Sequence, residues 1–203
     1  MRHLAIIAAA LLMLVACSKE EEILPKQQEK MVQYLTSTHQ PRLVAVEDVE
    51  TGTEQPYYEQ FGNTVYRYID GAYNPDRATR KEVTEQSIVT ITFRAYLFEF
   101  RNIVTDGSRL TMPFWTNDPL LQASLESENV GLTPGGWKFE PLTINLATDQ
   151  VIPGLRLSLI GCREQDSVES YMTYTMAYGD KELMNFIPKE SPIAYFFTID
   201  KVE

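Results

Sequence analysis

Two stretches of the chain alternate apolar and polar residues, which is the pattern of a strand with one buried face. The apolar positions fall on every second residue from Ser87 to Leu97, and the same period returns from Ile193 to Asp200. Side chains of a strand point alternately to its two faces, so this period predicts half-buried antiparallel strands. The chain is therefore expected to build around a sheet.

Composition agrees with a β-rich domain and limits its partners. The 203 residues are enough for one domain of ordinary size, and they include 11 Tyr and 9 Phe, which favour sheet packing. The formal net charge is −10. Nucleic acid is excluded as a partner, because binding to a phosphate backbone needs a basic surface.

Histidine and cysteine are scarce, with two of each in the whole sequence. A His-rich metal site or a four-Cys zinc site cannot be built from them, so we expect no metal and no cofactor. A Ser/His/Asp triad would have to use His39, which lies in the polar stretch 37–40. We interpret His39 as a solvated loop residue.

The N-terminus has the features of an export signal. Arg2 and His3 precede an unbroken apolar run over residues 4–15, too short for a membrane span of about 20 residues but suited to a signal peptide. The string Leu14-Val15-Ala16-Cys17 resembles the lipobox of bacterial lipoproteins. That resemblance implies a signal peptide over 1–16, lipidation of Cys17 and attachment to the outer membrane. A soluble secretory signal with an incidental cysteine is the alternative.

Behind Cys17 the chain is charged. Residues 17–26 form an acidic tether, and Glu20 to Glu22 resemble the surface-export signal of Bacteroidetes-type lipoproteins; a plain solvated tether has the same composition. The membrane face, periplasmic or outer, stays open. With Cys17 lipidated, Cys162 has no partner within the chain and is expected to be a small buried residue.

The rest of the chain divides into an N-terminal extension, 27–60, and a domain, 61–203. A short amphipathic helix is predicted over 27–35, followed by polar, irregular chain to residue 60 with at most a strand at 43–46. Further strands are predicted at 63–69, 110–115, 142–146 and 170–176, a loop at 133–136, and one helix at 155–160. This is an α+β fold, a curled antiparallel sheet wrapped on one short helix. The extension is a dimerising arm, a spacer or a cover for the sheet.

Several strings in the domain resemble the FKBP-type peptidyl-prolyl isomerases. Val151-Ile152-Pro153-Gly154 matches the turn before that family's helix, and Ala177-Tyr178-Gly179 matches its AYG string. Ile187-Pro188 ahead of the last strand and the strand at 89–93 also match in order and spacing. The resemblance covers roughly residues 63–203.

The resemblance implies an isomerase of X–Pro bonds that acts on proline-containing peptide segments of exported proteins without covalent chemistry. The slow step is rotation about the X–Pro amide, which an apolar bowl accelerates by desolvating that amide. Carried over by position, the hydroxyl of Tyr178 and the backbone N–H of Ile152 hold the substrate. The resemblance assigns the walls and floor of the bowl to Phe93, Trp115, Leu142, Val151, Leu155, Ile187 and Tyr195.

The chain departs from the family at several of these positions. Phe93 replaces a Tyr, Leu142 an aromatic residue and Leu155 the Trp of the floor. No Asp directly follows the aromatic pair 114–115, and the family role of that Asp is not assigned to Asp118. An insertion over 120–141 contains Trp137, which is expected to refill part of the bowl. An active isomerase, a catalytically degenerate FKBP-like module that binds a peptide or partner, and a structural surface lipoprotein all remain open.

Overall fold

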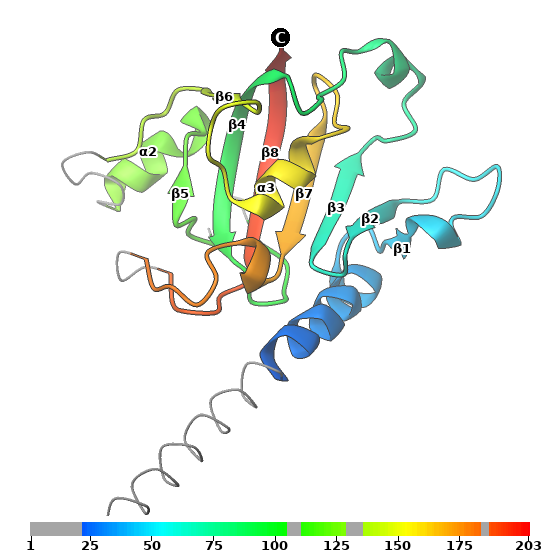
Figure 1. Ribbon diagram of the computed structural model, residues 1–203, viewed down its shortest axis with the longest axis horizontal. Coiled ribbons are helices and arrows are strands. Elements are labelled where there is room, and N and C mark those ends of the chain that lie inside the picture. Colours follow the sequence, from blue (N-terminus) through cyan, green and yellow to red (C-terminus); the bar gives the residue numbers. More distant parts are fainter. Residues whose placement is uncertain (1–21, 105–110, 129–135, 184–186) are drawn as a thin grey trace, which may run out of the picture.

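The computed structural model describes residues 22–104, 111–128, 136–183 and 187–203, which form one sheet with helices packed against it (Figure 1). The strand order is β1-β2-β3-β7-β8-β4-β5, and β6 pairs with β4. The strands are β1 (Val44–Ala45), β2 (Tyr57–Phe61), β3 (Val65–Asp70), β4 (Ile88–Leu97), β5 (Trp115–Thr116), β6 (Leu142–Asn145), β7 (Ser167–Met172) and β8 (Ile193–Val202).

The helical elements lie at the start of the chain and between strands. They are a helix over 22–33, α2 (Pro119–Ser127), α3 (Pro153–Leu159) and the short turns η1 (Tyr34–Thr38), η2 (Val46–Asp48), η3 (Pro75–Thr79) and η4 (Tyr174–Met176). Within the described ranges, no helix has the length and hydrophobicity that a transmembrane span requires.

The strands β4 and β8 form the centre of the sheet. Their antiparallel ladder runs over both strands and opposes Phe93 to Phe197 and Ala95 to Tyr195. Among the described pairings only β1 with β2 is parallel. The predicted fold class, an antiparallel sheet on a short helix with a helical N-terminal extension, is confirmed.

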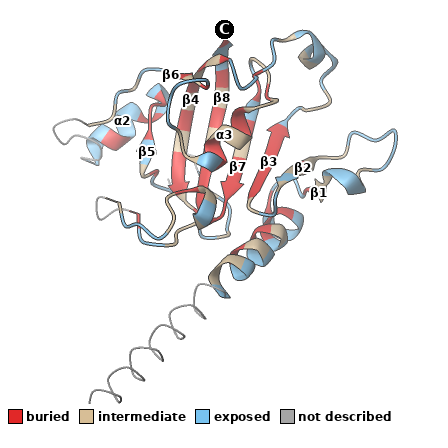
Figure 2. Cartoon of the chain, viewed as in Figure 1, coloured by how far each residue is buried: buried red, intermediate tan, exposed pale blue. Residues whose placement is uncertain are grey.

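The sheet is buried on both faces, and Figure 2 shows its central strands in red. In β3, Val65 and Ile69 join the core under α3, whereas Tyr66 and Tyr68 join a second core on the outer face. Alternate side chains of a strand point to opposite faces, so each face packs against a separate layer. The alternation predicted from Ser87 to Leu97 is seen in β4, where buried and partly buried residues alternate over most of the strand, whereas β3 is buried on both faces.

The outer layer is the N-terminal extension. Its helix is described from residue 22, inside the predicted acidic tether. Met31 of this helix and Leu35 of η1 are completely buried against the outer face. The segment 36–60, predicted to be irregular, adds β1 and β2 to the edge of the sheet. Of the three roles open for the extension, the structure shows a cover for the sheet, because its apolar residues pack on the tyrosines of the outer face.

The interpretation of His39 as a solvated residue is wrong. Its side chain is 2% exposed, and its Nε2 lies 2.8 Å from Glu169 Oε2 on β7. The rings of Tyr34 and Tyr68 contact it edge-on. The imidazole is buried because the extension folds back over the sheet, which places His39 against Glu169.

A second correction concerns the insertion after β5. Residues 119–127 form α2, a helix that was not predicted for this part of the chain. Asp118 caps this helix by accepting a hydrogen bond from the Leu120 N–H, and Pro119 occupies its first turn, as is typical of helix starts. The predicted strand over 110–115 shrinks to β5, and residue 110 lies outside the described residues.

The helix α3 occupies nearly its predicted place and starts two residues early. Leu155 and Leu159 face the sheet and are buried. At its C-terminal end, Arg67 of β3 donates to the carbonyl oxygens of Ser158 and Ile160, at 3.0 and 2.6 Å. A buried cation thus satisfies carbonyls that a helix end leaves unpaired, which fixes α3 against β3.

Candidate functional site

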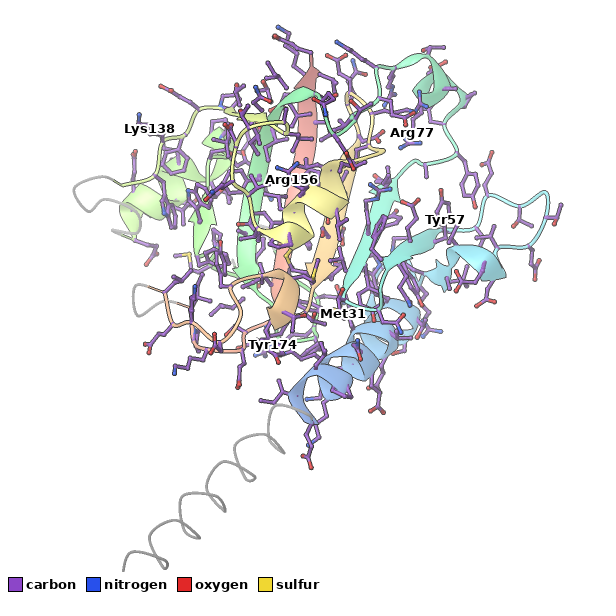
Figure 3. The ribbon with its side chains drawn as sticks, in the orientation of Figure 1. Met31, Tyr57, Arg77, Lys138, Arg156 and Tyr174 are labelled. Carbon is purple, nitrogen blue, oxygen red and sulfur yellow. The ribbon has the colours of Figure 1, made fainter. Side chains whose placement is uncertain are left out.

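The turn before α3 presents Val151 and Ile152, both half-buried. Arg156, labelled in Figure 3, holds this turn by donating to the carbonyl oxygens of Leu146 and Asp149, at 2.6 and 3.0 Å. The backbone N–H of Ile152 makes no hydrogen bond to any described residue. It is therefore available as a donor, as the family resemblance requires.

The structure brings the sequence-predicted residues together in one apolar cluster beside α3. Phe93, Leu155, Ile187 and Tyr195 are buried members of that cluster, and Leu142, Val151, Ile152 and Tyr178 pack against it half-buried. Trp115 is 38% exposed and joins through its ring, whose centroid lies 4.7 Å from that of Phe93. The buried members belong to the main core of the sheet, and the half-buried ones lie at its edge. Cys17 and Phe186, an alternative to Ile187, lie outside the described residues.

Aromatic rings form one wall of this site. The ring of Tyr195 lies 5.8 Å from Phe93 and 6.4 Å from Phe114, measured between centroids. Phe114 also contacts Tyr178, at 6.2 Å. Edge-on and tilted pairs at these separations are favourable arrangements, so the wall is a packed unit.

Two hydroxyl groups meet in this wall. Those of Tyr178 and Tyr195 lie 3.2 Å apart. Burial raises the pKa of Tyr178, and it raises the pKa of Tyr195 further because that side chain is deeper in the core. Both residues are therefore neutral hydrogen-bonding groups at physiological pH, and neither serves as a base.

A cavity of about 350 Å³ adjoins the floor on the side of β5 and β6. It is lined by Phe93, Trp115 and Leu142, and by Trp137 and Lys138 from the chain before β6, the latter labelled in Figure 3. Neither Ile152 nor Tyr178 reaches this cavity. Trp137 thus lies beside the predicted bowl and builds a second aromatic compartment with Trp115.

Sequence reasoning missed Asn117, which organises this region. Its side-chain oxygen accepts from the Phe93 N–H at 2.6 Å, and its amide donates to the carbonyl oxygens of Ile91 and Glu140. Asn117 thereby ties the chain before β6 to β4. No local sequence pattern marks it, because its partners lie 23 to 26 residues away.

The residue after it, Asp118, has a structural role. Its carboxylate pairs with Arg94 at 2.6 Å, in addition to capping α2. This agrees with leaving Asp118 out of the catalytic assignment. The described residues contain no group of acidic, His and Cys side chains that would hold a metal ion.

Cys162 is buried and reduced, at the end of α3. Its thiol donates to the carbonyl oxygen of Ser158 at 3.0 Å. Burial raises its pKa to about 12. A thiol that stays protonated is a poor nucleophile, so Cys162 is a packing residue.

Comparison with known proteins supports an FKBP-type domain. Residues 123–199 match the family model described as FKBP-type peptidyl-prolyl cis-trans isomerase. That range contains the turn before α3, the string around Tyr178 and the wall residue Tyr195, whereas Phe93 and Trp115 precede it. No curated protein matches the chain.

Two solved structures that are similar to the chain come from Arabidopsis thaliana. The N-terminal domain of FKBP42 is 13% identical, with a TM-score of 0.46, over 76% of this chain and 98% of that one. A multi-domain immunophilin is 14% identical, with a TM-score of 0.45, over 76% of this chain and 47% of that one. The chain thus spans about half the length of the multi-domain protein.

Proposed function

We propose that this protein is a lipid-anchored peptidyl-prolyl cis–trans isomerase that acts on X–Pro bonds of exported proteins. The observation that carries the proposal is the joint placement of two donors, the Ile152 N–H and the Tyr178 hydroxyl, on the rim of one apolar, aromatic cluster. Both donors fall in the range that matches the isomerase family model.

The proposed reaction needs no covalent chemistry from the protein. Rotation about an X–Pro amide is slow because the C–N bond has partial double-bond character. Apolar walls disfavour the charge-separated resonance form, and this lowers the barrier to rotation. The Ile152 N–H and the Tyr178 O–H hold substrate carbonyls while the proline ring rests on Val151 and the aromatic wall. Neutral donors suffice, in agreement with the raised pKa of Tyr178.

A second candidate function is a peptide-binding module without isomerase activity. It is favoured by the burial of the floor, where Leu155 is 5% exposed and Phe93 and Tyr195 are 2% exposed. The neighbouring cavity between Trp115 and Trp137 offers room for an apolar or proline-containing segment away from both rim donors.

A protease-free isomerisation assay on X–Pro peptides separates the two functions. Under the isomerase proposal the wild type accelerates exchange, Tyr178→Phe lowers kcat/KM, and Leu155→Trp raises it by restoring a flat floor. The control is Tyr73→Phe, since the buried Tyr73 hydroxyl has no hydrogen-bond partner among the described residues. The binding module would be established instead by two results together. Neither the wild type nor Leu155→Trp accelerates exchange above background, and Trp137→Ala weakens peptide binding.

The anchor is proposed from the sequence, because Cys17 lies outside the described residues. We place the protein on the outer membrane, on its periplasmic or outer face, with the acidic residues after Cys17 as tether. Replacing Cys17 by Ser is expected to release the protein from membrane fractions. Retention of the variant would contradict the anchor, and protease accessibility on intact cells would identify the membrane face.

A further inference from the structure

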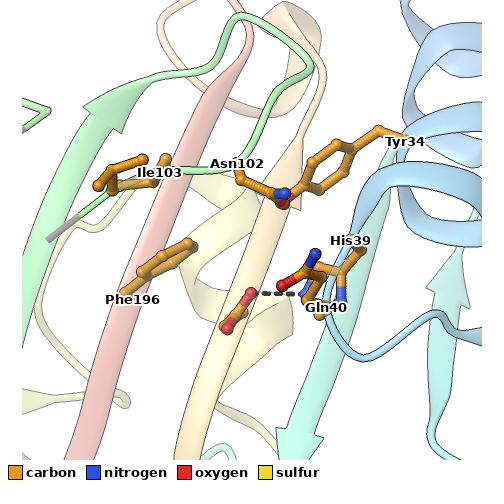
Figure 4. A pocket seen from close by; sticks show the side chains of 8 residues that line it. Tyr34, His39, Gln40, Asn102, Ile103 and Phe196 are labelled. Carbon is orange, nitrogen blue, oxygen red and sulfur yellow. Dashed lines mark hydrogen bonds and ion pairs between the residues drawn. The ribbon is translucent and has the colours of Figure 1, made fainter. Parts of the chain in front are cut away.

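A second cavity, of about 380 Å³, lies on the outer face of the sheet, opposite α3 (Figure 4). Its walls come from the N-terminal extension, the chain after β4, and the strands β7 and β8. The volume falls in the lower part of the range of small-molecule pockets, roughly 300–1,000 Å³. The proposed isomerase site makes no use of this cavity.

Among the described residues that line the cavity, the acidic group is Glu169. Its Oε2 accepts from His39 Nε2 at 2.8 Å, the contact dashed in Figure 4, and from the hydroxyl of Tyr171. Its Oε1 makes no hydrogen bond or ion pair to any described residue, and the side chain is 29% exposed. One carboxylate oxygen therefore carries both contacts, and the other has no partner among the described residues, on a side chain that lines the cavity.

His39 behind it is set up to carry a proton on each ring nitrogen, since Nδ1 faces the Pro41 carbonyl and Nε2 faces Glu169. Burial acts to lower the pKa of His39, but the hydrogen bonds that its ring makes to Glu169 and to the Pro41 carbonyl outweigh burial, so the pKa is raised. The other titratable groups that face His39 are Tyr34, Tyr68 and Tyr171. Burial raises the pKa of each, so they stay neutral and Glu169 is the charged neighbour.

The opposite wall is apolar. Ile103 and Phe196 are half-buried, and Val104 is 38% exposed. A carboxylate oxygen beside such a wall matches a cationic head on an aliphatic chain, and an adjacent aromatic ring adds attraction for the cation. The net charge of −10 attracts cations to the surface.

We propose that this cavity binds a primary ammonium group carried on an alkyl chain, with Glu169 Oε1 as its acceptor and Ile103, Val104 and Phe196 along the chain. A guanidinium group fits less well, because its two parallel hydrogen bonds need both carboxylate oxygens and Oε2 is already occupied by two donors. The ammonium group comes from a lysine side chain or from a free aliphatic amine.

Binding is linked to the protonation of His39. An ammonium group on Oε1 and an imidazolium on Oε2 repel each other, so the ligand favours neutral His39. Linkage is reciprocal: raising the pH strengthens binding, and the ligand lowers the pH at which His39 titrates. A purely structural His39–Glu169 pair would show neither effect.

The test is calorimetric titration of the purified protein with n-butylammonium chloride at several pH values, with n-butylguanidinium and n-butanol in parallel. We expect one saturable site with a Kd of about 1 mM or tighter, weaker binding of the other two probes, and affinity that rises with pH. NMR of the His39 ring is expected to show its titration moving to lower pH with ligand. Absence of saturable binding, or equal binding of n-butanol, overturns the proposal.

Two variants assign the site. Glu169→Gln is expected to weaken n-butylammonium binding by at least ~10-fold, whereas Glu85→Gln, an exposed carboxylate elsewhere, leaves it unchanged. Val104→Lys places an ammonium group in the cavity without touching the buried pair, and is expected to abolish binding in a folded protein. Unchanged binding in Val104→Lys would overturn the site.

N-acetyl-lysine methylamide and 1,5-diaminopentane then distinguish a lysine side chain from a free amine as the preferred source.

Discussion

The hydroxyl of Tyr195 has the hydroxyl of Tyr178, 3.2 Å away, as its only hydrogen-bond partner among the described residues. Because Tyr195 is 2% exposed and a buried hydroxyl needs an acceptor, we assign the donor role in this contact to Tyr195 and the acceptor role to Tyr178 Oη. Tyr178 is half-buried and keeps its own proton free. The buried tyrosine thus orients the donor on the rim of the proposed site.

Tyr195→Phe is expected to lower kcat/KM for X–Pro isomerisation by about fivefold, the equivalent of one hydrogen bond of ~1 kcal/mol. Tyr178→Phe removes the donor itself and is expected to cost more. The measurement is the protease-free assay, with Tyr73→Phe as control. Full activity of Tyr195→Phe beside an impaired Tyr178→Phe would show that Tyr195 has no orienting role.

Gly154 stands where α3 approaches β7 and η4 most closely. A Cβ at this position would lie 2.5 Å from Met172 Sδ and 2.9 Å from the backbone oxygen of Met176. Gly154→Ala is therefore expected to destabilise the fold by about 1–3 kcal/mol through overpacking, measured by urea unfolding. Gly71→Ala is the control: its φ of +63° penalises a side chain but its surroundings are open, so it is expected to cost about 1 kcal/mol or less. Equal losses would refute the steric account.

The buried His39–Glu169 pair makes stability depend on pH. The pKa of His39 is raised in the folded chain, so its contribution is complete below the unfolded value of about 6.5 and is lost as the pH rises through the folded value. The free energy of unfolding is expected to fall in that window by up to about 1.4 kcal/mol per pH unit. His39→Gln should remove this slope in urea titrations at several pH values. A slope that persists in the variant would have to come from other groups.

The parts of the fold that sequence predicts well are those with local signals. Alternation marked β4 and β8 because each is long and has one apolar face, and the turn Val151 to Gly154 located α3. The signal for α2 was also local: Asp118 and Pro119 precede Leu121 and Leu125, which are spaced four apart and buried. The loop predicted at 133–136 falls mostly on residues 133–135, which lie outside the described residues.

What sequence could not predict depends on partners far along the chain. His39 looked solvated because Glu169, which accounts for its burial, lies 130 residues away. The outer core of tyrosines was hidden for the same reason, since β3 shows its second buried face only when the extension folds over it. In the candidate site, the motif strings gave no signal for the cavity that Trp137 lines together with Phe93, Trp115 and Leu142.

Gln27 joins the N-terminal helix to the two chain segments that flank Tyr178. Its Nε2 donates to the Glu190 carbonyl oxygen at 2.8 Å, and its Oε1 accepts from the Tyr174 N–H at 3.0 Å. These segments are also joined by hydrogen bonds from Gly179 to Tyr174 and from Glu190 to Gly179. The buried side-chain amide of Gln27 thus fixes the loop that carries the Tyr178 hydroxyl.

Gln27→Ala is expected to cost about 1–2 kcal/mol of stability, because it removes two hydrogen bonds to backbone groups in a half-buried place. The Tyr174 amide should exchange faster with solvent than in the wild type, and kcat/KM should fall as Tyr178 loses its fixed position. Gln33→Ala is the matched control, since Gln33 is exposed and its side chain makes no hydrogen bond to a described residue. Gln27→Ala could lose stability while its Tyr174 exchange rate and its kcat/KM equal those of Gln33→Ala. In that case the Gln27 hydrogen bonds only anchor the helix. If all three change together, the extension that covers the outer face also positions the site on the inner face.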